Sequence, residues 1–344
     1  MNRRHFLATL PAFATLASLP GVARAQHAAG LTPLRFSLDF RVTSQTSPFF
    51  LAQSKAYYRD EGLDVTIDVG AGSVASITRI ATGAYDLALG DLSALIEFQA
   101  QNPDNNSVKA VYQYYNRAPF AIIGRKDRGI TNDFASLAGK KVAAAAVEST
   151  RRMWPMLARH LNLDVKLFEW VTTDFAVRDN VLLRGDVDAA TYFHDSAASL
   201  FARMPEKEFS VLKYADTGLD LYGNAILASQ KLIAERPQVV AAFLRATNRA
   251  LRETVSDAAP ALAAIKAREP ILNMEMETVR WQITRDYVAA ADARTDGLGA
   301  VRMDLVERQI AAVAATFDLA RPPRAEALYD LSLLPAAAER KVLA

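Results

Sequence analysis

Two stretches decide the fold: Leu34-Arg-Phe-Ser-Leu-Asp-Phe40 and Leu63-Asp-Val-Thr-Ile-Asp-Val69. In both, apolar and polar side chains alternate, which is typical of a β-strand with one buried face. Between them, Ser47-Pro48 predicts the start of a helix, because a hydroxyl suits the helix cap and proline costs little in the first turn. We expect this helix to run to Asp60 and to stop at Gly62. Residues 34–69 are therefore predicted to form a strand, a helix and a second strand.

The alternation of strand and helix continues after residue 69. Gly70-Ala-Gly-Ser73 predicts a tight turn, residues 74–82 a helix that ends at Gly83, and Asp86-Leu-Ala-Leu-Gly90 a third, apolar strand. Strands that alternate with helices of about ten residues indicate parallel β-α-β units. The predicted fold class is therefore α/β, with a mixed, mainly parallel sheet flanked by helices.

A second copy of the pattern follows further along the chain. Residues 140–147 predict a strand and residues 151–161 a helix. Gly62-Leu-Asp-Val65 is echoed by Asn162-Leu-Asp-Val165, and Gly83-Ala-Tyr-Asp86 by Gly185-Asp-Val-Asp188, at offsets of 100 and 102 residues. Two echoes that agree so closely in spacing predict two similar α/β lobes.

The order of the elements predicts how the two lobes are joined. Strand-rich crossings are expected at residues 108–123 and 219–227. Four helices are predicted after the second crossing, at residues 237–255, 260–268, 275–291 and 304–317. Because these helices bring no strands of their own, we expect them to pack on the first lobe. We therefore assign residues 34–116 and 223–340 to lobe I and residues 117–222 to lobe II, and two crossings between lobes predict a hinge and a cleft that can close.

The N-terminus has the features of an export signal. Arg3-Arg-His-Phe-Leu7 opens an apolar stretch that runs to Leu19, and Ala23-Arg-Ala25 offers small residues where a signal peptidase cleaves. The twin arginine indicates export of an already folded chain. We expect residues 1–25 to be removed and the mature protein to be soluble in a periplasm.

Composition narrows the classes of function. The chain carries 40 basic and 38 acidic residues and no cysteine, and removing the predicted signal leaves 37 basic residues against 38 acidic ones. A nearly neutral chain argues against a nucleic-acid or membrane-surface partner. No apolar run after the N-terminus is long enough to cross a membrane. Without cysteine, disulfides, thiolate metal sites and cysteine-linked lipids are excluded; no histidine pair indicates a metal, and no cofactor is predicted.

Several motifs together resemble those of a known family. Residues 49–65, the turn at residues 70–73 and Ala81-Thr-Gly-Ala-Tyr-Asp-Leu-Ala88 are similar to periplasmic substrate-binding proteins of ABC importers, as are Leu137-Ala-Gly-Lys-Lys-Val142 and residues 236–243. The similarity is to the branch that serves nitrate, alkanesulfonates, taurine, thiamine-precursor pyrimidines and aromatic acids. It implies a type II binding-protein fold, one small ligand enclosed between two lobes, and an ABC import permease as the partner of a monomer.

Ligand-binding residues are expected beyond the carboxyl ends of the strands, toward which helix N-termini also point. The predicted set combines turn residues, helix starts, aromatic side chains and polar side chains that follow strands: Phe40, Arg41, Ser47, Gly72, Ser73, Asp91, Tyr115, Asn116, Ser149, Thr150, Arg151, Tyr192, His194 and Tyr222. The simpler alternatives are a plain turn for Gly72, a helix cap for Ser47 and core packing for some aromatic rings. Asp39, Asp91, Asp174 and Asp195 are a further group that could pair in space. No catalytic or metal-binding residue is predicted.

The candidate residues favour two properties in the ligand. Arg41, Arg151 and Arg152 favour a negatively charged group, since a cation at a helix N-terminus is otherwise unfavourable. The aromatic side chains favour a planar ring. The predicted ligand is a planar aromatic or organic acid or sulfonate, with a thiamine-precursor pyrimidine as the alternative.

An enzyme is not expected, because no nucleotide-binding glycine pattern, phosphate loop or nucleophile elbow occurs. A pyrimidine-synthase-like enzyme is kept as an alternative of another class. Fungal thiamine-pyrimidine synthases share the fold implied by the resemblance, but they have a cysteine-rich motif and no export signal. A ligand-sensing module that docks to a receptor is a third alternative.

Overall fold

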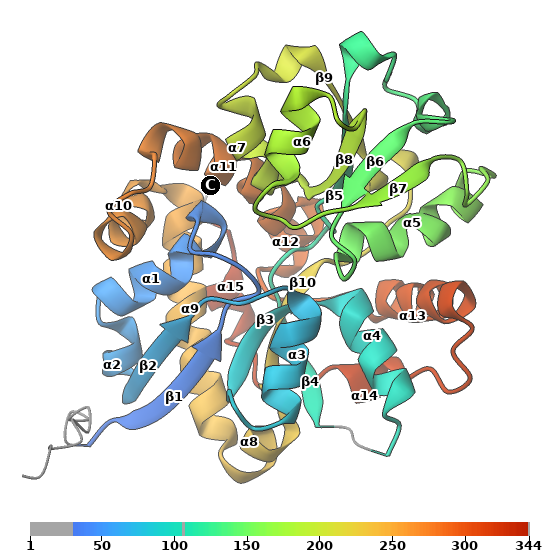
Figure 1. Ribbon diagram of the computed structural model, residues 1–344. Coiled ribbons are helices and arrows are strands. Elements are labelled where there is room, and N and C mark those ends of the chain that lie inside the picture. Colours follow the sequence, from blue (N-terminus) through green and yellow to red (C-terminus); the bar gives the residue numbers. More distant parts are fainter. Residues whose placement is uncertain (1–29, 105–106, 343–344) are drawn as a thin grey trace, which may run out of the picture.

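The computed structural model describes residues 30–104 and 107–342. The predicted signal peptide lies outside these residues. The described chain forms two sheets of five strands each, with helices around both (Figure 1). This arrangement confirms the predicted α/β fold with two sheet-centred halves.

The first sheet has the strand order β2 (Leu63–Asp68), β1 (Thr32–Ser37), β3 (Leu87–Asp91), β10 (Asn224–Ser229), β4 (Val108–Gln113). β1 is parallel to β2 and β3, whereas β10 is antiparallel to β3 and β4. The sheet is therefore mixed, and its three parallel strands come from the segment that begins the described chain.

The second sheet has the strand order β7 (Glu169–Thr172), β6 (Lys141–Ala144), β8 (Ala189–Phe193), β5 (Phe120–Arg125), β9 (Phe209–Lys213). β6 is parallel to β7 and β8, and β5 is antiparallel to β8 and β9. Position by position, this order repeats that of the first sheet. The strand in the fourth position of each sheet, β10 or β5, is the first strand after a crossing from the other sheet.

The helices used below have these bounds: α1 (Ser47–Ser54), α2 (Tyr57–Asp60), α3 (Ser73–Ala81), α4 (Leu92–Gln101), α5 (Ser149–His160), α6 (Arg178–Arg184), α7 (Ala198–Phe201), α8 (Gln230–Glu235), α9 (Pro237–Ser256), α10 (Ala259–Arg268), α11 (Met274–Val288), α12 (Ala291–Asp296), α13 (Met303–Phe317), α14 (Ala325–Leu328) and α15 (Ala337–Arg340). Two short 3-10 turns also matter, η1 (Ser44–Thr46) and η4 (His194–Ala197).

The boundaries predicted for the lobes stay a prediction. The chain passes from the first sheet to the second between β4 and β5, and it returns between β9 and β10.

The helix predicted after Ser47 differs in two details. It is split into α1 and α2, because Ala56 adopts a left-handed backbone with φ of 60°. Ser47 is the first helical residue and not the cap, and the cap residue Thr46 makes no side-chain capping bond. Pro48 lies in the first turn, as predicted.

The C-terminal helices do not all pack on the first sheet. α9 and α10 pack on α1, and α13 packs on α4, as the sequence predicts. In contrast, α11 contacts both η1 of the first half and η4 and α7 of the second half, and α13 also contacts α5. One buried apolar cluster accordingly joins Leu95, Trp154 and Val306 across the two halves. The C-terminal helices α11 and α13 therefore contact both halves of the molecule.

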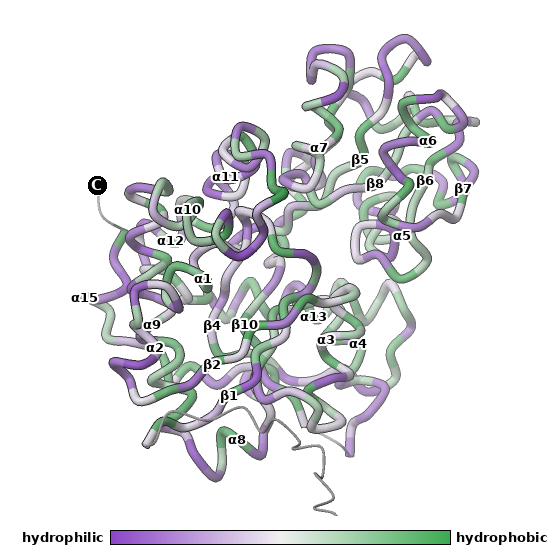
Figure 2. Tube along the Cα trace, turned by 60° about the vertical axis from the view of Figure 1, so that its left-hand side comes forward, coloured by the Kyte–Doolittle hydropathy of each residue, from purple (hydrophilic) through white to green (hydrophobic). Residues whose placement is uncertain are grey.

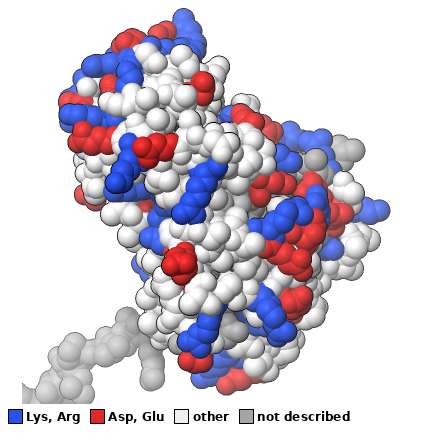
Figure 3. All heavy atoms as spheres, turned by 90° about the vertical axis from the view of Figure 1, so that its right-hand side faces the viewer, with Lys and Arg blue, Asp and Glu red and all other residues white. Residues whose placement is uncertain are grey.

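Polarity follows this architecture. The strands of both sheets are largely apolar, while the outer helices alternate between apolar and polar residues (Figure 2). On the face shown in Figure 3, basic and acidic side chains are interspersed over both halves. Within residues 30–104 and 107–342, no helix is both long and apolar enough to cross a membrane.

Candidate functional site

A small pocket lies between the two halves, at the carboxyl ends of the parallel strands. Its volume is about 70 Å³, and it is lined by Asp39, Phe40, Gln45, Gly72, Ser73, Val147, Glu148, Ser149, Phe175, Arg178, Phe193 and Ser196. The first five follow β1 and β2, and the other seven lie at or after the ends of strands of the second sheet. This is the position in which open α/β sheets bind ligands.

Two aromatic rings meet across the pocket mouth. Phe40, just after β1, and Phe175, just before α6, have ring centroids 5.1 Å apart and are tilted by 57°. Outside them lies a wider cavity of about 470 Å³, whose lining includes Arg41 and Ile271. Ligand pockets are usually about 300–1,000 Å³, so the inner pocket is smaller than such sites, and Phe40 and Phe175 line both it and the wider cavity.

The second-half wall of the pocket carries a buried ion pair. Arg178 Nη1 lies 2.8 Å from Glu148 Oε1, and Thr191 Oγ1 donates a hydrogen bond of 2.6 Å to Glu148 Oε2. The guanidinium also stacks over the Tyr192 ring at 3.8 Å. Burial raises the pKa of Glu148, and the charge of Arg178 opposes that shift. Arg178 Nε has no hydrogen-bond partner among the described residues.

The first-half wall carries a buried carboxyl without an ion-pair partner. Asp39 Oδ2 accepts a hydrogen bond of 2.7 Å from Asn224 Nδ2, whereas Asp39 Oδ1 has no partner within the described chain. Burial, together with the nearby charge of Asp195, raises the pKa of Asp39 to about 7, and the hydrogen bond from Asn224 opposes this shift. Asp195, in η4, accepts from Tyr115 Oη at 2.5 Å and from Thr284 Oγ1 at 3.0 Å.

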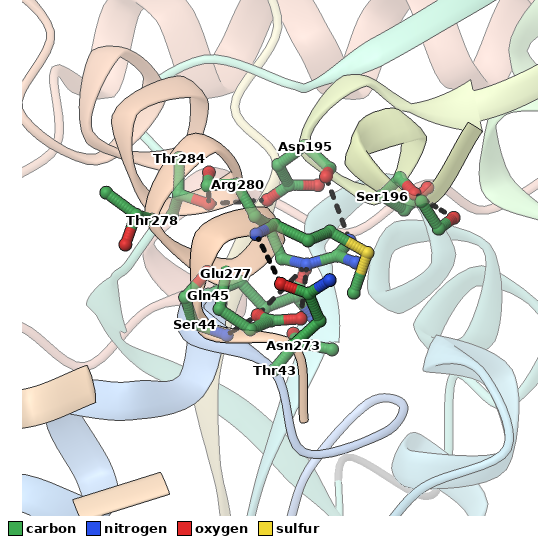
Figure 4. Close-up of polar contacts among 12 residues, drawn as sticks. Thr43, Ser44, Gln45, Asp195, Ser196, Asn273, Glu277, Thr278, Arg280 and Thr284 are labelled. Carbon is green, nitrogen blue, oxygen red and sulfur yellow. Dashed lines mark hydrogen bonds and ion pairs between the residues drawn. The ribbon is translucent and has the colours of Figure 1, made fainter. Parts of the chain in front are cut away.

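A network on α11 joins the two walls (Figure 4). Glu277 and Arg280 form a buried ion pair of 3.1 Å. Glu277 Oε2 accepts from the backbone N–H of Ser44 at 2.6 Å, and Arg280 Nη1 donates to the backbone oxygen of Asp195 at 2.9 Å. This network therefore holds η1 of the first half and η4 of the second half on the same helix.

The structure brings some predicted residues to the pocket wall: Phe40, Gly72, Ser73 and Ser149. Arg41 is exposed and lines only the wider outer cavity, where its guanidinium lies 5.1 Å from the Phe40 ring centre. Gly72 has a φ of 102°, which favours glycine, and it directly precedes α3.

Other predicted residues are buried and do not line the pocket. Thr150 donates to the backbone oxygen of Tyr192, and Tyr192 donates to Asp179. His194 Nδ1 lies 3.0 Å from Tyr287 Oη, and burial lowers the pKa of His194 to about 4. The remaining buried residues of this group are Ser47, Asp91, Tyr115 and Asn116.

Two predicted residues point elsewhere. Arg151 stacks over the Trp170 ring at 5.0 Å and donates to Thr172. Tyr222 accepts a hydrogen bond from the backbone N–H of Arg302 and lies in the core beneath α13. Neither side chain lines the pocket.

Eight wall residues were absent from the predicted ligand-binding set: Asp39, Gln45, Val147, Glu148, Phe175, Arg178, Phe193 and Ser196. Glu148 carries a usable signal, because it lies in the short turn between β6 and α5 and directly precedes α5. Phe175 and Arg178 lie in and after an irregular loop, and nothing in the local pattern distinguishes them from surface residues.

Comparison with known proteins agrees with the fold and adds an activity class. The chain is 24% identical over 250 residues to a 4-amino-5-hydroxymethyl-2-methylpyrimidine phosphate synthase of Aspergillus parasiticus, covering 70% of this chain and 71% of the relative. It is 25% identical over 259 residues to the riboflavin-binding protein RibY of Chloroflexus aurantiacus, covering 72% and 70%. The synthase is named as an enzyme, and this finding contradicts the prediction that the chain is not an enzyme.

Among solved structures, the periplasmic aliphatic sulphonate binding protein SsuA of Escherichia coli superposes with a TM-score of 0.70 at 15% identity, covering 88% of this chain and 94% of SsuA. This likeness confirms the periplasmic-binding-protein fold. A sequence profile described as NMT1/THI5 like matches residues 43–261. Because that match covers more than half of the chain, the chain belongs to the NMT1/THI5-like family.

Proposed function

We propose that the chain binds a small planar nitrogen heterocycle, of the aminopyrimidine class, in the pocket between its two halves. The observation that carries this proposal is a buried carboxyl oxygen of the pocket wall, Asp39 Oδ1, that has no hydrogen-bond partner among the described residues. Asp39 and Glu148 both face the pocket as carboxyls, and Arg178 is already paired with Glu148. A buried acceptor that lacks a partner costs about 1–3 kcal/mol, and the N–H groups of an amino heterocycle supply the missing donors.

The aromatic pair favours a flat ligand. A planar ring that enters between Phe40 and Phe175 exchanges one ring contact for two. Aromatic pairs contribute about 0.5–1.5 kcal/mol beyond the area they bury. Both relatives described above carry a planar nitrogen heterocycle in their names, a pyrimidine in one and riboflavin in the other.

The placement of the arginines removes the basis for an organic acid or sulfonate. Arg151 packs on Trp170, and Arg152 pairs with Glu97 of α4. Arg41 lies outside the aromatic pair. Inside the pocket an anion would face the carboxyls of Asp39 and Glu148 and a single guanidinium, that of Arg178, which is already paired with Glu148; this balance of charge disfavours an anion.

The site of action is proposed to be the periplasm, with delivery of the ligand to an import permease. The fold shared with SsuA supports this part of the proposal, as does the twin-arginine N-terminus. Titration of a membrane-embedded permease with the ligand-saturated protein and the ligand-free protein tests it. We expect association of the ligand-saturated form only.

A thermal-shift series tests the ligand class. The probe is 4-amino-5-hydroxymethyl-2-methylpyrimidine, and its matched control is the analogue with a methyl group in place of the amino group. A ligand at a hundred times its dissociation constant stabilises a protein by about 2.7 kcal/mol, which raises the melting temperature by several degrees. Benzoate and an alkanesulfonate complete the series. Stabilisation by either acid, without stabilisation by the amino probe, would refute the proposal.

A second candidate function is catalysis on the bound heterocycle. The names of the fungal relatives favour it, and so does Asp39, a pocket carboxyl whose pKa of about 7 suits a general acid or base near neutral pH. Mass spectrometry of the probe after incubation with the protein tests this function. A new product that Asp39→Asn abolishes supports it, and recovery of unchanged probe contradicts it for this ligand.

A further inference from the structure

The Arg178 side chain carries one donor that the described chain leaves without a partner. Arg178 begins α6 and is buried, with 6% of its surface exposed. Its Nη1 lies 2.8 Å from Glu148 Oε1, and its Nη2 donates to Ser196 Oγ at 3.3 Å. Its Nε has no hydrogen-bond partner within the described residues. Since a guanidinium is a donor at every nitrogen and accepts at none, an acceptor from outside these residues is required to satisfy Nε.

The neighbours of Arg178 hold its guanidinium in one plane. The guanidinium carbon lies 3.8 Å from the ring centre of Tyr192 and 5.6 Å from that of Phe175. Tyr192 is held in turn by a hydrogen bond of 2.8 Å to Asp179. An arginine that is both stacked and paired presents its donors in a rigid fork. The Nε–H bond of Arg178 therefore keeps one direction as long as the stacking and the ion pair persist.

Asp39 and Arg178 line the same pocket from opposite halves of the molecule. Asp39 follows β1 of the first sheet, Arg178 follows β7 of the second, and both side chains line the pocket of about 70 Å³. Asp39 Oδ1 is a buried acceptor without a partner in the described chain, and Arg178 Nε is a buried donor without one. Buried polar groups in proteins are nearly always hydrogen-bonded. Two unpaired groups of opposite kind on facing walls therefore indicate a ligand that completes both bonds.

The balance of charge favours a neutral acceptor for Arg178 Nε. Glu148 already compensates the charge of Arg178, and Thr191 donates to the second oxygen of the same carboxylate. An anionic group of the ligand would add a negative charge beside Glu148 and Asp39. A ring nitrogen accepts a hydrogen bond without adding charge.

We propose that Arg178 Nε donates to a ring nitrogen of the bound heterocycle, on the ring edge opposite the amino group that donates to Asp39. This inference rests on the proposed function and adds to it a required acceptor and its position on the ligand. In 4-amino-5-hydroxymethyl-2-methylpyrimidine, the ring nitrogen that lies directly across the ring from the amino group meets the requirement. We call it the distal ring nitrogen. The ligand class is thereby narrowed to heterocycles with a donor and an acceptor on opposite edges.

Isothermal titration with matched ligands tests this assignment. The amino probe is compared with an analogue that has C–H in place of the distal ring nitrogen, at pH 9, where both are uncharged. The analogue leaves Arg178 Nε unpaired in the complex, so it should bind the wild type about tenfold more weakly or worse. Arg178→Lys keeps a positive charge beside Glu148 but lacks the Nε–H, so it should bind the probe and the analogue with nearly equal affinity.

A crossed comparison separates the two walls. The analogue with a methyl group in place of the amino group lacks the donor to Asp39 and keeps the distal ring nitrogen. Asp39→Asn should abolish the preference for the amino group and keep the preference for the nitrogen, and Arg178→Lys should do the reverse. Arg203→Lys is the matched control, because Arg203 bonds to Asn180 and does not line the pocket. Its affinities should equal those of the wild type.

The outcomes distinguish this inference from the proposed function. If the wild type binds the probe and the C–H analogue equally well, Arg178 Nε does not contact the ligand; the inference fails and the proposed function stands. A preference for the distal ring nitrogen that persists in Arg178→Lys would also overturn the inference. If Arg178→Lys folds poorly, the comparison of the two ligands on the wild type still tests it. Absence of any binding of the amino probe would remove the proposed function and the inference together.

Discussion

The ion pair on α11 gives the sharpest prediction for stability. Glu277 has no exposed side-chain surface and Arg280 has 6%. Replacing one partner with leucine leaves the other as a buried, uncompensated charge, which costs about 3–5 kcal/mol. Arg280→Leu also removes a donor from the backbone oxygen of Asp195, and Glu277→Leu removes the acceptor of the Ser44 N–H. We expect each single variant to lose about 4 kcal/mol of unfolding free energy.

The double variant Glu277→Leu with Arg280→Leu has a different expected cost. It contains no buried charge, so it loses only the two backbone hydrogen bonds, at about 1–3 kcal/mol each. Its loss should therefore be smaller than the sum of the single losses by about 2 kcal/mol or more. Urea denaturation of the four proteins measures this difference. Arg184→Leu is the matched control, because its partner Asp186 is half-exposed and such surface pairs contribute about 0–1 kcal/mol.

Either of two results would refute this reasoning. If the double variant loses as much as the two single variants together, Glu277 and Arg280 do not act as a pair. The loss would then come from the separate bonds to η1 and η4. A single-variant loss below about 1 kcal/mol would refute it as well, since it would mean that water reaches the remaining charge.

Three further predictions concern the pocket and its supports. Phe175→Leu should weaken binding of a planar ligand by about tenfold in isothermal titration, from loss of ring stacking. Phe201→Leu, at a partly buried ring that does not line the pocket, should leave affinity unchanged. Asp91→Asn should keep the cap on α4 and remove a pH dependence. Burial raises the pKa of Asp91 to about 7, so the wild type is more stable when this carboxyl is protonated and loses that stability as the pH rises from about 4 to 7. Urea denaturation at pH 5 and pH 8 measures the change in unfolding free energy. An equal change in the wild type and in Asp91→Asn would contradict the prediction. Gly70→Ala should abolish ligand binding and lower the melting temperature, because the added Cβ would lie 2.1 Å from the backbone oxygen of Leu38.

The sequence predicts the architecture well because the architecture depends on local, repeated patterns. The echo between residues 62–65 and 162–165 corresponds to β2 in the first sheet and to the approach to β7 in the second. The two sheets have matching strand orders. Periodicity and turn residues indicate where the strands and helices lie and which of them are neighbours. A two-sheet architecture can therefore be predicted from a single sequence.

The pairing of the side chains in and around the pocket could not be predicted in the same way. Glu148 and Arg178 are 30 residues apart, and Ser44 and Glu277 are 233 apart. Only folding brings these partners together, and no local pattern records which arginine meets which carboxylate. For this reason the predicted ligand-binding set includes Arg41 and Arg151 and does not include Arg178. Helix capping was equally ambiguous, since Ser47 begins α1 without capping it.

The narrow pocket sets a condition on any ligand of this protein. The ring centroids of Phe40 and Phe175 lie 5.1 Å apart, so a ligand that enters between the rings has to replace this contact. A ligand shifts the balance between open and closed forms only by the difference in its affinity for the two. Asp39 and Glu148 stand on opposite halves and face the same space only when the halves are together. A ligand that donates to one wall gains little from closure, whereas a ligand with donors at two edges gains both bonds at once. For that reason we expect heterocycles with two separated N–H or O–H donors to bind more tightly than those with one, and the gain should exceed the contribution of a single neutral hydrogen bond, about 1 kcal/mol.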